Sequence, residues 1–131
     1  MGYSNWSTVS SFTTKSVYIA SVEQAKLVAS DGATSDFFGY SVSISADGVY
    51  AVIGAYYDDI GANTDQGSAY IFVRSGTSWT QQAKLVASDG ATSDWFGFSV
   101  SISADGAYAV IGARYDDVGA NTNQGSAYIF A

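Results

Sequence analysis

Short segments with alternating apolar and polar residues recur along the chain, and turn-forming residues separate them. Residues 39–45 (GYSVSIS) place three apolar side chains on one face and three serines on the other, a pattern that predicts a β-strand. The Ala-Asp-Gly sequence at 46–48 predicts a hairpin turn, in which the glycine accepts a positive φ. Residues 50–55 (YAVIGA) are almost uniformly apolar and predict a second strand that is covered on both faces.

Two further strands follow this hairpin. Residues 57–67 predict a loop, residues 68–73 (SAYIFV) predict a third strand, and residues 79–87 predict a fourth after a turn at Ser75-Gly76. No segment has the periodicity of an amphipathic helix. Four antiparallel strands joined by tight turns form the blade of a β-propeller, so we expect an all-β fold built from propeller blades.

The blade sequence occurs twice in the chain. Residues 25–73 recur at 83–131, 58 positions further along, so the chain holds two blades. The copies differ at seven positions: Phe37/Trp95, Tyr40/Phe98, Val49/Ala107, Tyr56/Arg114, Ile60/Val118, Asp65/Asn123 and Val73/Ala131. A repeat unit of this size cannot bury its own apolar faces, and two copies are normally too few for a stable array. We therefore expect other copies of the chain to complete the ring.

The order of the segments along the chain indicates how one copy would complete a blade of another copy. Residues 1–16, rich in Ser and Thr, are expected to be a flexible or swapped arm, and residues 17–29 an outer strand that completes a blade. Residues 30–87 form the first blade repeat with its fourth strand, and residues 88–131 form the second repeat without one. A six-bladed homotrimer is the first expectation and an eight-bladed homotetramer the next. An open filament, or a fragment or engineered piece with no function alone, remain as alternatives.

Two short motifs connect the chain to a known family. Phe38-Gly39 opens the first strand and Ile53-Gly54-Ala55 ends the second, and both recur at Phe96-Gly97 and Ile111-Gly112-Ala113. These motifs, over residues 24–131, resemble FG-GAP repeats, the propeller blades of integrin α-subunit heads and of bacterial surface and secreted proteins. The resemblance implies an extracellular or cell-surface location and a role in binding or adhesion.

The chain departs from the integrin pattern in two respects. The proline of Gly-Ala-Pro is replaced by Tyr56 or Arg114, and the calcium loop between the first two strands is reduced to residues 46–48. No integrin-type metal site is therefore expected at that turn.

Composition narrows the function further. The chain has neither histidine nor cysteine, so it lacks the usual general base, disulfides and thiolate metal ligands, and we do not expect an enzyme. Its net charge of −7 and its five scattered basic residues argue against nucleic acid as a partner. No apolar run is long enough to predict membrane insertion. A non-catalytic binding or scaffold module is the expected function.

Nine of the twelve carboxylates fall in two kinds of loop that emerge at the same rim of a blade. Such residues fill loops because they cap turns and keep the surface soluble, which is one interpretation. The other is a calcium site, since oxygen ligands from convergent loops suit a hard cation. The candidate metal ligands are Asp58, Asp59, Asn63 and Asp65, with Asp116, Asp117, Asn121 and Asn123 in the second copy.

Aromatic residues divide into two groups. Those in the strands are expected to form the core between blades: Phe38, Tyr70, Phe72, Phe96, Tyr128 and Phe130. Those at loop edges vary between the copies, either because tolerant surface positions drift or because exposed rings stack on sugars. The candidate residues for a glycan or protein ligand are Asp31, Asp36, Phe37, Tyr56, Asp89, Asp94, Trp95 and Arg114.

Overall fold

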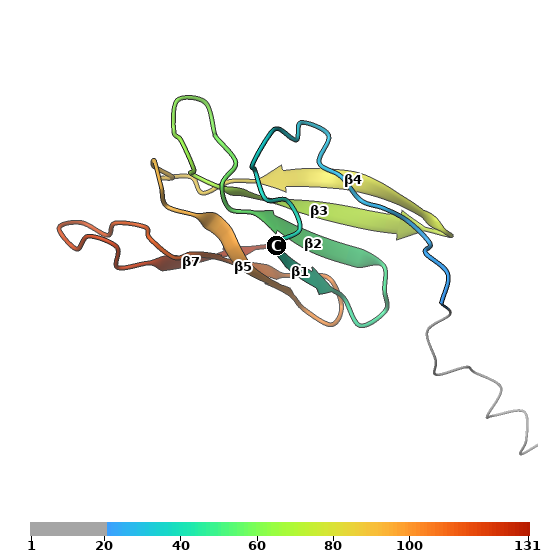
Figure 1. Cartoon of the computed structure of the whole chain (residues 1–131). Coiled ribbons are helices and arrows are strands. Elements are labelled where there is room, and N and C mark those ends of the chain that lie inside the picture. The colour runs from blue at the N-terminus through green and yellow to red at the C-terminus, as the bar shows by residue number, and fades with distance from the viewer. Residues whose placement is uncertain (1–20) are drawn as a thin grey trace, which may run out of the picture.

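A computed structural model describes residues 21–131, which form two antiparallel sheets and no helix. The first sheet has the order β1 (Ser41–Ile44), β2 (Tyr50–Ala55), β3 (Ser68–Ser75) and β4 (Ser78–Leu85). The second has the order β5 (Phe96–Ile102), β6 (Ala109–Ala113) and β7 (Ser126–Phe130), as Figure 1 shows. The two sheets, called blade 1 and blade 2 below, confirm the predicted all-β fold with two propeller blades.

The first hairpin of each blade is held by the predicted turn. The Asp47 carboxylate accepts a hydrogen bond from the Ser45 hydroxyl at 2.6 Å and another from the Val49 backbone N–H at 3.0 Å. Gly48 takes a φ of +69°, which an L side chain rarely adopts. Asp105 makes the same two bonds in blade 2. These two acidic residues, which lie outside the loop rim, therefore act as turn caps.

The core consists of two clusters on opposite faces of blade 1. The cluster between the blades contains Val52, Ala69, Ala87, Phe96, Ala109, Ile111 and Ala113, with Tyr128 and Phe130 packed against it. The cluster on the other face contains Ala51, Ile53, Ala55, Tyr70 and Phe72, with Leu27, Ala29, Phe38 and Trp79 packed against it. β2 contributes to both clusters, so it is covered on both faces, and all six predicted core aromatics lie in one cluster or the other.

The blades touch through their backbones as well as their side chains. The Ser41 hydroxyl of β1 donates to the Gly97 carbonyl of β5 at 2.7 Å. Gly54 lies so close to β5 that a Cβ atom built on it would stand 2.0 Å from the same Gly97 oxygen. The glycines of the FG and GA motifs thus allow two strands of neighbouring blades to meet.

One apolar face of blade 1 is uncovered. β1 alternates as predicted, but Val42 and Ile44 are 63% and 58% exposed. Their counterparts in blade 2, Val100 and Ile102, are half-buried against the cluster between the blades. The difference arises because blade 1 covers the second pair, whereas no preceding blade covers the first within residues 21–131.

Residues 21–29 form no strand in this structure, because no sheet edge in the described chain pairs with them. Leu27 and Ala29 nevertheless pack against the cluster on the free face of blade 1. The predicted arm at 1–16 and the beginning of the predicted strand at 17–29 lie outside the described residues. No helix in the described part of the chain could cross a membrane.

Candidate functional site

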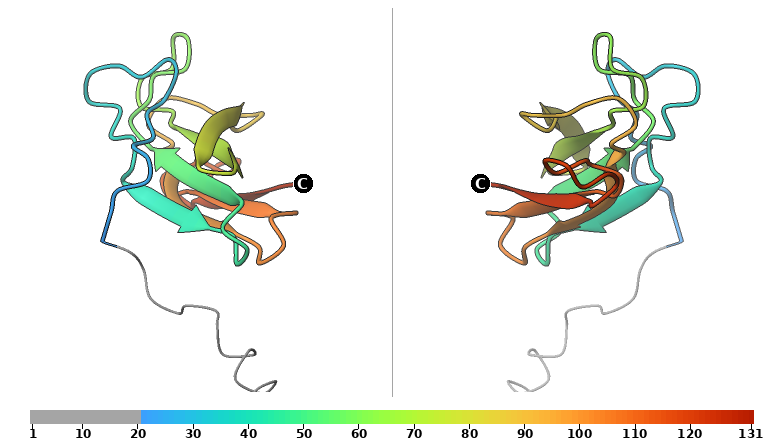
Figure 2. Two further views of the ribbon diagram at one scale, coloured as in Figure 1. Left: turned by 90° about the vertical axis from the view of Figure 1, so that its right-hand side faces the viewer. Right: turned by 90° about the vertical axis from the view of Figure 1, so that its left-hand side faces the viewer.

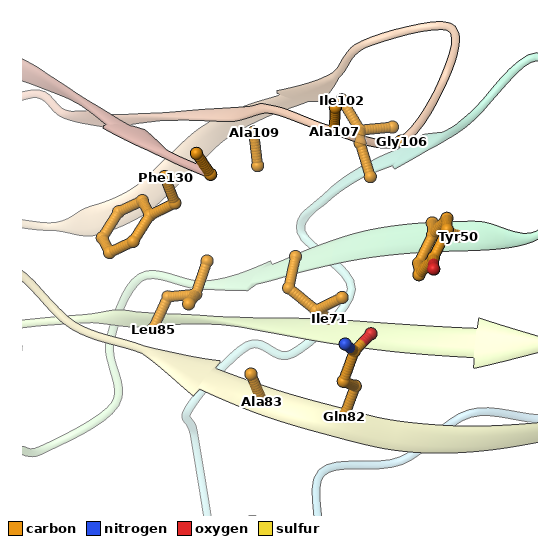
Figure 3. A pocket seen from close by; sticks show the side chains of 11 residues that line it. Tyr50, Ile71, Gln82, Ala83, Leu85, Ile102, Gly106, Ala107, Ala109 and Phe130 are labelled. Atoms are coloured by element: carbon orange, nitrogen blue, oxygen red, sulfur yellow. The ribbon is translucent and has the colours of Figure 1, made fainter.

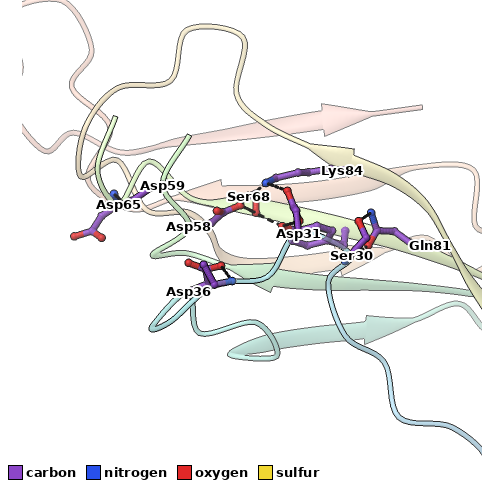
Figure 4. Close-up of polar contacts among 11 residues, drawn as sticks. Ser30, Asp31, Asp36, Asp58, Asp59, Asp65, Ser68, Gln81 and Lys84 are labelled. Carbon is purple, nitrogen blue, oxygen red and sulfur yellow. Dashed lines mark hydrogen bonds and ion pairs between the residues drawn. The ribbon is translucent and has the colours of Figure 1, made fainter. Parts of the chain in front are cut away.

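The two acidic loops of blade 1 meet around Lys84, which projects from β4 (Figure 4). Its ammonium group lies 2.6 Å from Oδ2 of Asp31 and 2.7 Å from Oδ2 of Asp58. The Tyr70 hydroxyl, from β3, donates to Asp31 at 2.8 Å and lies 3.2 Å from Asp58. Asp58 is buried and also accepts a hydrogen bond from the Ser68 hydroxyl at 2.6 Å. The loops preceding β1 and following β2 therefore share one rim, as the sequence predicted.

The cation at the centre of this network determines its protonation. The hydrogen bond from Lys84 lowers the pKa of Asp31 below its ordinary value. Burial disfavours the charge on Lys84, but its bonds to Asp31, Asp58 and Tyr70 outweigh that cost and raise the pKa of Lys84. Burial also raises the pKa of Tyr70, to about 12. The Lys84 ammonium thus joins Asp31 and Asp58, and the Tyr70 hydroxyl bonds to the same two side chains.

Blade 2 repeats this network without the cation. The Tyr128 hydroxyl donates to Asp89 at 2.8 Å and to Asp116 at 3.1 Å, and the Ser126 hydroxyl donates to Asp116. Burial and the bonds to these two carboxylates raise the pKa of Tyr128. Within residues 21–131, Lys84 makes the ion pairs and no lysine or arginine pairs with Asp89 or Asp116. The carboxylate cluster of blade 2 is therefore incomplete in one copy of the chain.

Asp36 and Asp94 hold their own loops in shape. Each is buried and accepts a hydrogen bond at 2.6 Å from a backbone N–H three residues earlier, at Ala33 and Ala91. Burial raises the pKa of Asp94, and Asp116, Asp117 and Asp89 add to the effect. These two candidate ligand residues face inward, so their first role is to cap the loop.

The candidate metal ligands are spread along the loops. Asp59 accepts the Asp65 backbone N–H at 2.8 Å, and Asp117 accepts that of Asn123 at 2.6 Å. Asn63 donates to Gln66 at 2.8 Å and across to the Gly90 carbonyl of the second repeat at 3.2 Å.

Its counterpart Asn121 donates to Gln124 within its own loop at 2.8 Å. Within residues 21–131, no three His, Cys, Asp or Glu side chains are grouped so as to hold a metal ion. Calcium binding stays a prediction.

Aromatic side chains gather where these loops meet the strands. We call this set the rim aromatic cluster; it comprises Phe37, Tyr40, Tyr56, Tyr57, Trp95, Phe98 and Tyr115, with Arg114 against it. Tyr56 joins the two repeats, since its ring centroid lies 5.1 Å from Trp95 and 5.3 Å from Phe98. The Arg114 guanidinium lies 5.2 Å from the Phe98 ring centre, in reach of a cation–π contact.

The cluster unites four of the predicted ligand residues, namely Phe37, Tyr56, Trp95 and Arg114. Sequence reasoning missed the other members. Tyr40 and Phe98 each lie three residues after a predicted loop-edge aromatic, and Tyr57 and Tyr115 precede the paired aspartates in both copies. The signal was therefore present as a repeated spacing of aromatics at the loop edges.

A separate apolar cavity of about 230 Å³ lies between the blades (Figure 3). Ile71 and Leu85 line it from blade 1, and Ile102 and Phe130 line it from blade 2. Tyr50 and Gln82 supply the polar side-chain atoms of its lining.

Repeated antiparallel sheets that pack face to face, with loops gathered on one rim, define the protein as a β-propeller-type repeat module. The family model of the FG-GAP repeat matches residues 21–72 and again residues 79–130. The chain belongs to the FG-GAP repeat family, and the resemblance seen in its motifs is confirmed. A search of curated proteins returned no match.

Proposed function

We propose that the chain is a non-catalytic binding and scaffold module of the cell exterior, which assembles with copies of itself into a propeller and binds a glycan on its rim. The rim aromatic cluster is the observation that carries this proposal. It exposes Phe37 and Tyr40 by 49% and 55% beside the acidic loops, and Arg114 is also exposed. Exposed aromatic surface next to polar groups is characteristic of a binding site.

The chemistry of the cluster suits a sugar. Aromatic faces pack against the apolar face of a pyranose ring, while nearby carboxylates and a guanidinium exchange hydrogen bonds with its hydroxyls. Asp31 lies in the adjoining loop, although its carboxylate is already engaged by Lys84 and Tyr70. Arg114 supplies a cationic donor beside the acidic loops. A protein ligand with exposed aromatic or acidic side chains is the other ligand class that fits this rim.

The same proposal includes calcium, as an ion weakly bound at the loops around Asp58 and Asp116. Both loops carry paired aspartates, and a cation there would relieve repulsion in a protein of net charge −7. The extracellular location rests on the resemblance to the FG-GAP repeat family alone. Neither catalysis nor nucleic-acid binding is part of the proposal.

The test is a titration of the 131-residue protein with a panel of defined oligosaccharides, followed by tryptophan fluorescence and calorimetry; Trp95 lies in the rim aromatic cluster. Phe37→Ala should weaken binding about tenfold, as expected when one aromatic contact of about 1.4 kcal/mol is lost. Val118→Ala, an exposed apolar position in the loop between β6 and β7, is the control and should bind as the wild type does. If the two variants bind alike, or no oligosaccharide binds, the rim is not a glycan site.

A second candidate function, a structural subunit of an extracellular filament, is favoured by a different observation. The exposed apolar residues Val42 and Ile44 lie on blade 1, whereas Ile129, 67% exposed, lies on blade 2. Contacts between two unlike faces form a closed ring only if the rotation closes, and otherwise a helical fibre. Negative-stain images separate the two outcomes directly.

A further inference from the structure

Within residues 21–131 no lysine pairs with the carboxylate cluster of blade 2, and the repeat itself indicates which lysine would do so. In blade 1, Lys84 of β4 binds Asp31 and Asp58. Subtracting the 58-residue offset from Lys84 leads to Lys26, in a segment that reads AKLVA in both places. Lys26 is exposed, and the blue segment of residues 21–29 that contains it lies on the opposite side of blade 1 from β7 in both Figure 1 and Figure 2.

We propose that residues 22–27 of one copy add to β7 of a second copy as its fourth strand, and that Lys26 of the added strand pairs with Asp89 and Asp116. The inference rests on the self-assembly in the proposed function and specifies its interface. It does not depend on the glycan or on calcium.

The register of the added strand follows from blade 1. There β3 and β4 pair antiparallel, with Ala69 opposite Leu85, Tyr70 opposite Lys84 and Ile71 opposite Ala83. The same pairing in the assembly sets Ala127 of one copy opposite Leu27 of the other, Tyr128 opposite Lys26, and Ile129 opposite Ala25. The exposed edge of β7 would then gain the ladder of hydrogen bonds that an edge strand leaves unmade.

The donor segment already has the position that this role requires. In blade 1, Leu85 ends β4 and Ala87 follows it, and both contribute to the cluster between the blades. Leu27 and Ala29 pack in the same way against the free face of blade 1. Residues 21–29 thus lie where the fourth strand of a preceding blade would lie, although the described residues of one copy form no sheet beside them.

The uncovered faces of blade 1 and blade 2 are complementary to each other in the same way as the two faces that pack together between the blades. Val52 and Ala69 of blade 1 are fully buried by blade 2. Their counterparts Val110 and Ala127 are more exposed, and Ile129 beside them is 67% exposed. A shallow hollow of about 250 Å³ on this face is lined by Ile129, Val110 and Tyr108, among others.

The opposite face, on blade 1, offers Val42 and Ile44. Their counterparts Val100 and Ile102 pack against blade 1 inside the chain. The contact between the blades therefore shows the geometry expected for the contact between copies. In both contacts an apolar face packs on an apolar face, and a lysine pairs with two carboxylates. Because unlike faces meet, the assembly is head-to-tail.

One difference between the repeats makes the proposed interface distinguishable from the internal one. Trp79 of β4 packs against the cluster on the free face of blade 1, and its Nε1 donates to Gln24 at 3.2 Å. The counterpart of Trp79 in the donor segment is Ser21, which is much smaller. The added strand therefore lacks the aromatic side chain that Trp79 of β4 places against the free-face cluster.

The test uses the absence of cysteine from the natural chain. Ala25→Cys and Ile129→Cys are each made in a separate 131-residue chain; both positions are exposed in a single copy, so the fold should tolerate them. Opposed residues of an antiparallel pair are close enough for a disulfide. On mild oxidation, a mixture of the two variants should yield a disulfide-linked dimer, while each variant alone should yield little.

The control pairs Ile129→Cys with Glu23→Cys, whose counterpart in β4, Gln81, bonds to Ser30 rather than facing blade 2. A control mixture that cross-links as well as the Ala25→Cys mixture would overturn the register. Cross-linking within each variant alone would overturn the head-to-tail arrangement. No cross-link in the Ala25→Cys mixture overturns the proposal, even where sedimentation shows assembly, in which case self-assembly stands and another interface carries it.

The role of Lys26 is tested by exchanging charges. Lys26→Glu and Asp89→Lys should each raise the dissociation constant of the assembly about tenfold or more, because each places like charges together. The double variant Lys26→Glu with Asp89→Lys restores opposite charges and should recover most of the loss. A double variant that assembles no better than either single variant would show that the two residues do not meet.

Discussion

Lys84 lies 2.7 Å from the buried carboxylate of Asp58, so the outer strand of blade 1 neutralises a charge inside its loop rim. The counterpart carboxylate, Asp116, has no such cation within residues 21–131. Two nearly identical segments therefore differ in electrostatics because one has a fourth strand and the other does not.

Lys84→Met should destabilise the fold more than a substitution of a partly exposed residue on an edge strand usually does. It leaves Asp58 buried with hydroxyl donors alone, and breaking a buried pair costs about 3–5 kcal/mol; because Lys84 is partly exposed, we expect about 2 kcal/mol. Urea unfolding of the variant against wild type measures the loss. Lys26→Met is the matched control and should leave the unfolding free energy of a single copy unchanged. Equal losses would mean that the ion pair contributes nothing specific.

The same network predicts that Asp31 contributes folding stability that is lost in acid. Its folded pKa lies below the ordinary value, so the stability it contributes is complete above that value and is lost as pH falls through the lower folded pKa. Asp31→Asn should therefore be less stable than wild type at pH 6, and the two unfolding curves should converge by about pH 2. A difference that stayed constant over this range would assign the effect of the substitution to shape rather than charge.

Gly54 and Gly112 occupy equivalent positions but different surroundings. A Cβ on Gly54 would stand 2.0 Å from the Gly97 carbonyl oxygen, whereas one on Gly112 would first meet the Ser99 hydroxyl, at 2.3 Å. Backbone cannot move aside as a side chain can, so Gly54→Ala should cost about 2 kcal/mol or more and Gly112→Ala clearly less. Thermal unfolding at concentrations too low for assembly checks this order. If Gly112 meets a second copy, Gly112→Ala should impair assembly while it preserves the fold.

The number of blades should be even, because each copy contributes two. Six blades from three copies is the expected ring and eight from four copies the next, which excludes a closed seven-bladed ring. Native mass spectrometry of the 131-residue protein measures the number of copies. A stable monomer, or a dimer with no larger species, would contradict the ring.

Calcium should raise the melting temperature slightly, and the first repeat should contribute more to that rise. Asp65 is a carboxylate where the second repeat has Asn123, and the number of charged ligands helps set calcium affinity. Melting with calcium against chelator, in wild type and in Asp65→Asn, separates the possibilities. Without a shift in wild type, the carboxylates are turn caps and ion-pair partners alone. An equal shift in both proteins would place the cation elsewhere, most plausibly near Asp31 and Asp36.

The sequence by itself determined the blade. An almost uniformly apolar run bounded by turn residues predicted β2 with its observed bounds, Tyr50–Ala55, and the Ala-Asp-Gly sequence predicted the Asp47 turn before it, because strand propensity and hairpin chemistry are local properties. The repeat and its FG and GA motifs identified the family and the core aromatics. The pattern also indicated that the acidic loops share a rim, since connections on the same side of a blade must emerge together.

Only the tertiary structure decided which loop residues contact one another and which carboxylates are already engaged in hydrogen bonds or ion pairs. Lys84 reaches Asp31 across 53 positions of chain, and Tyr56 joins Trp95 from the other repeat. No periodicity carries that information, because such contacts depend on the angle and distance between packed sheets. The same packing shows that Val100 is covered where its identical counterpart Val42 is not. Identical residues differ here because burial depends on the neighbouring blade, which the local sequence does not contain.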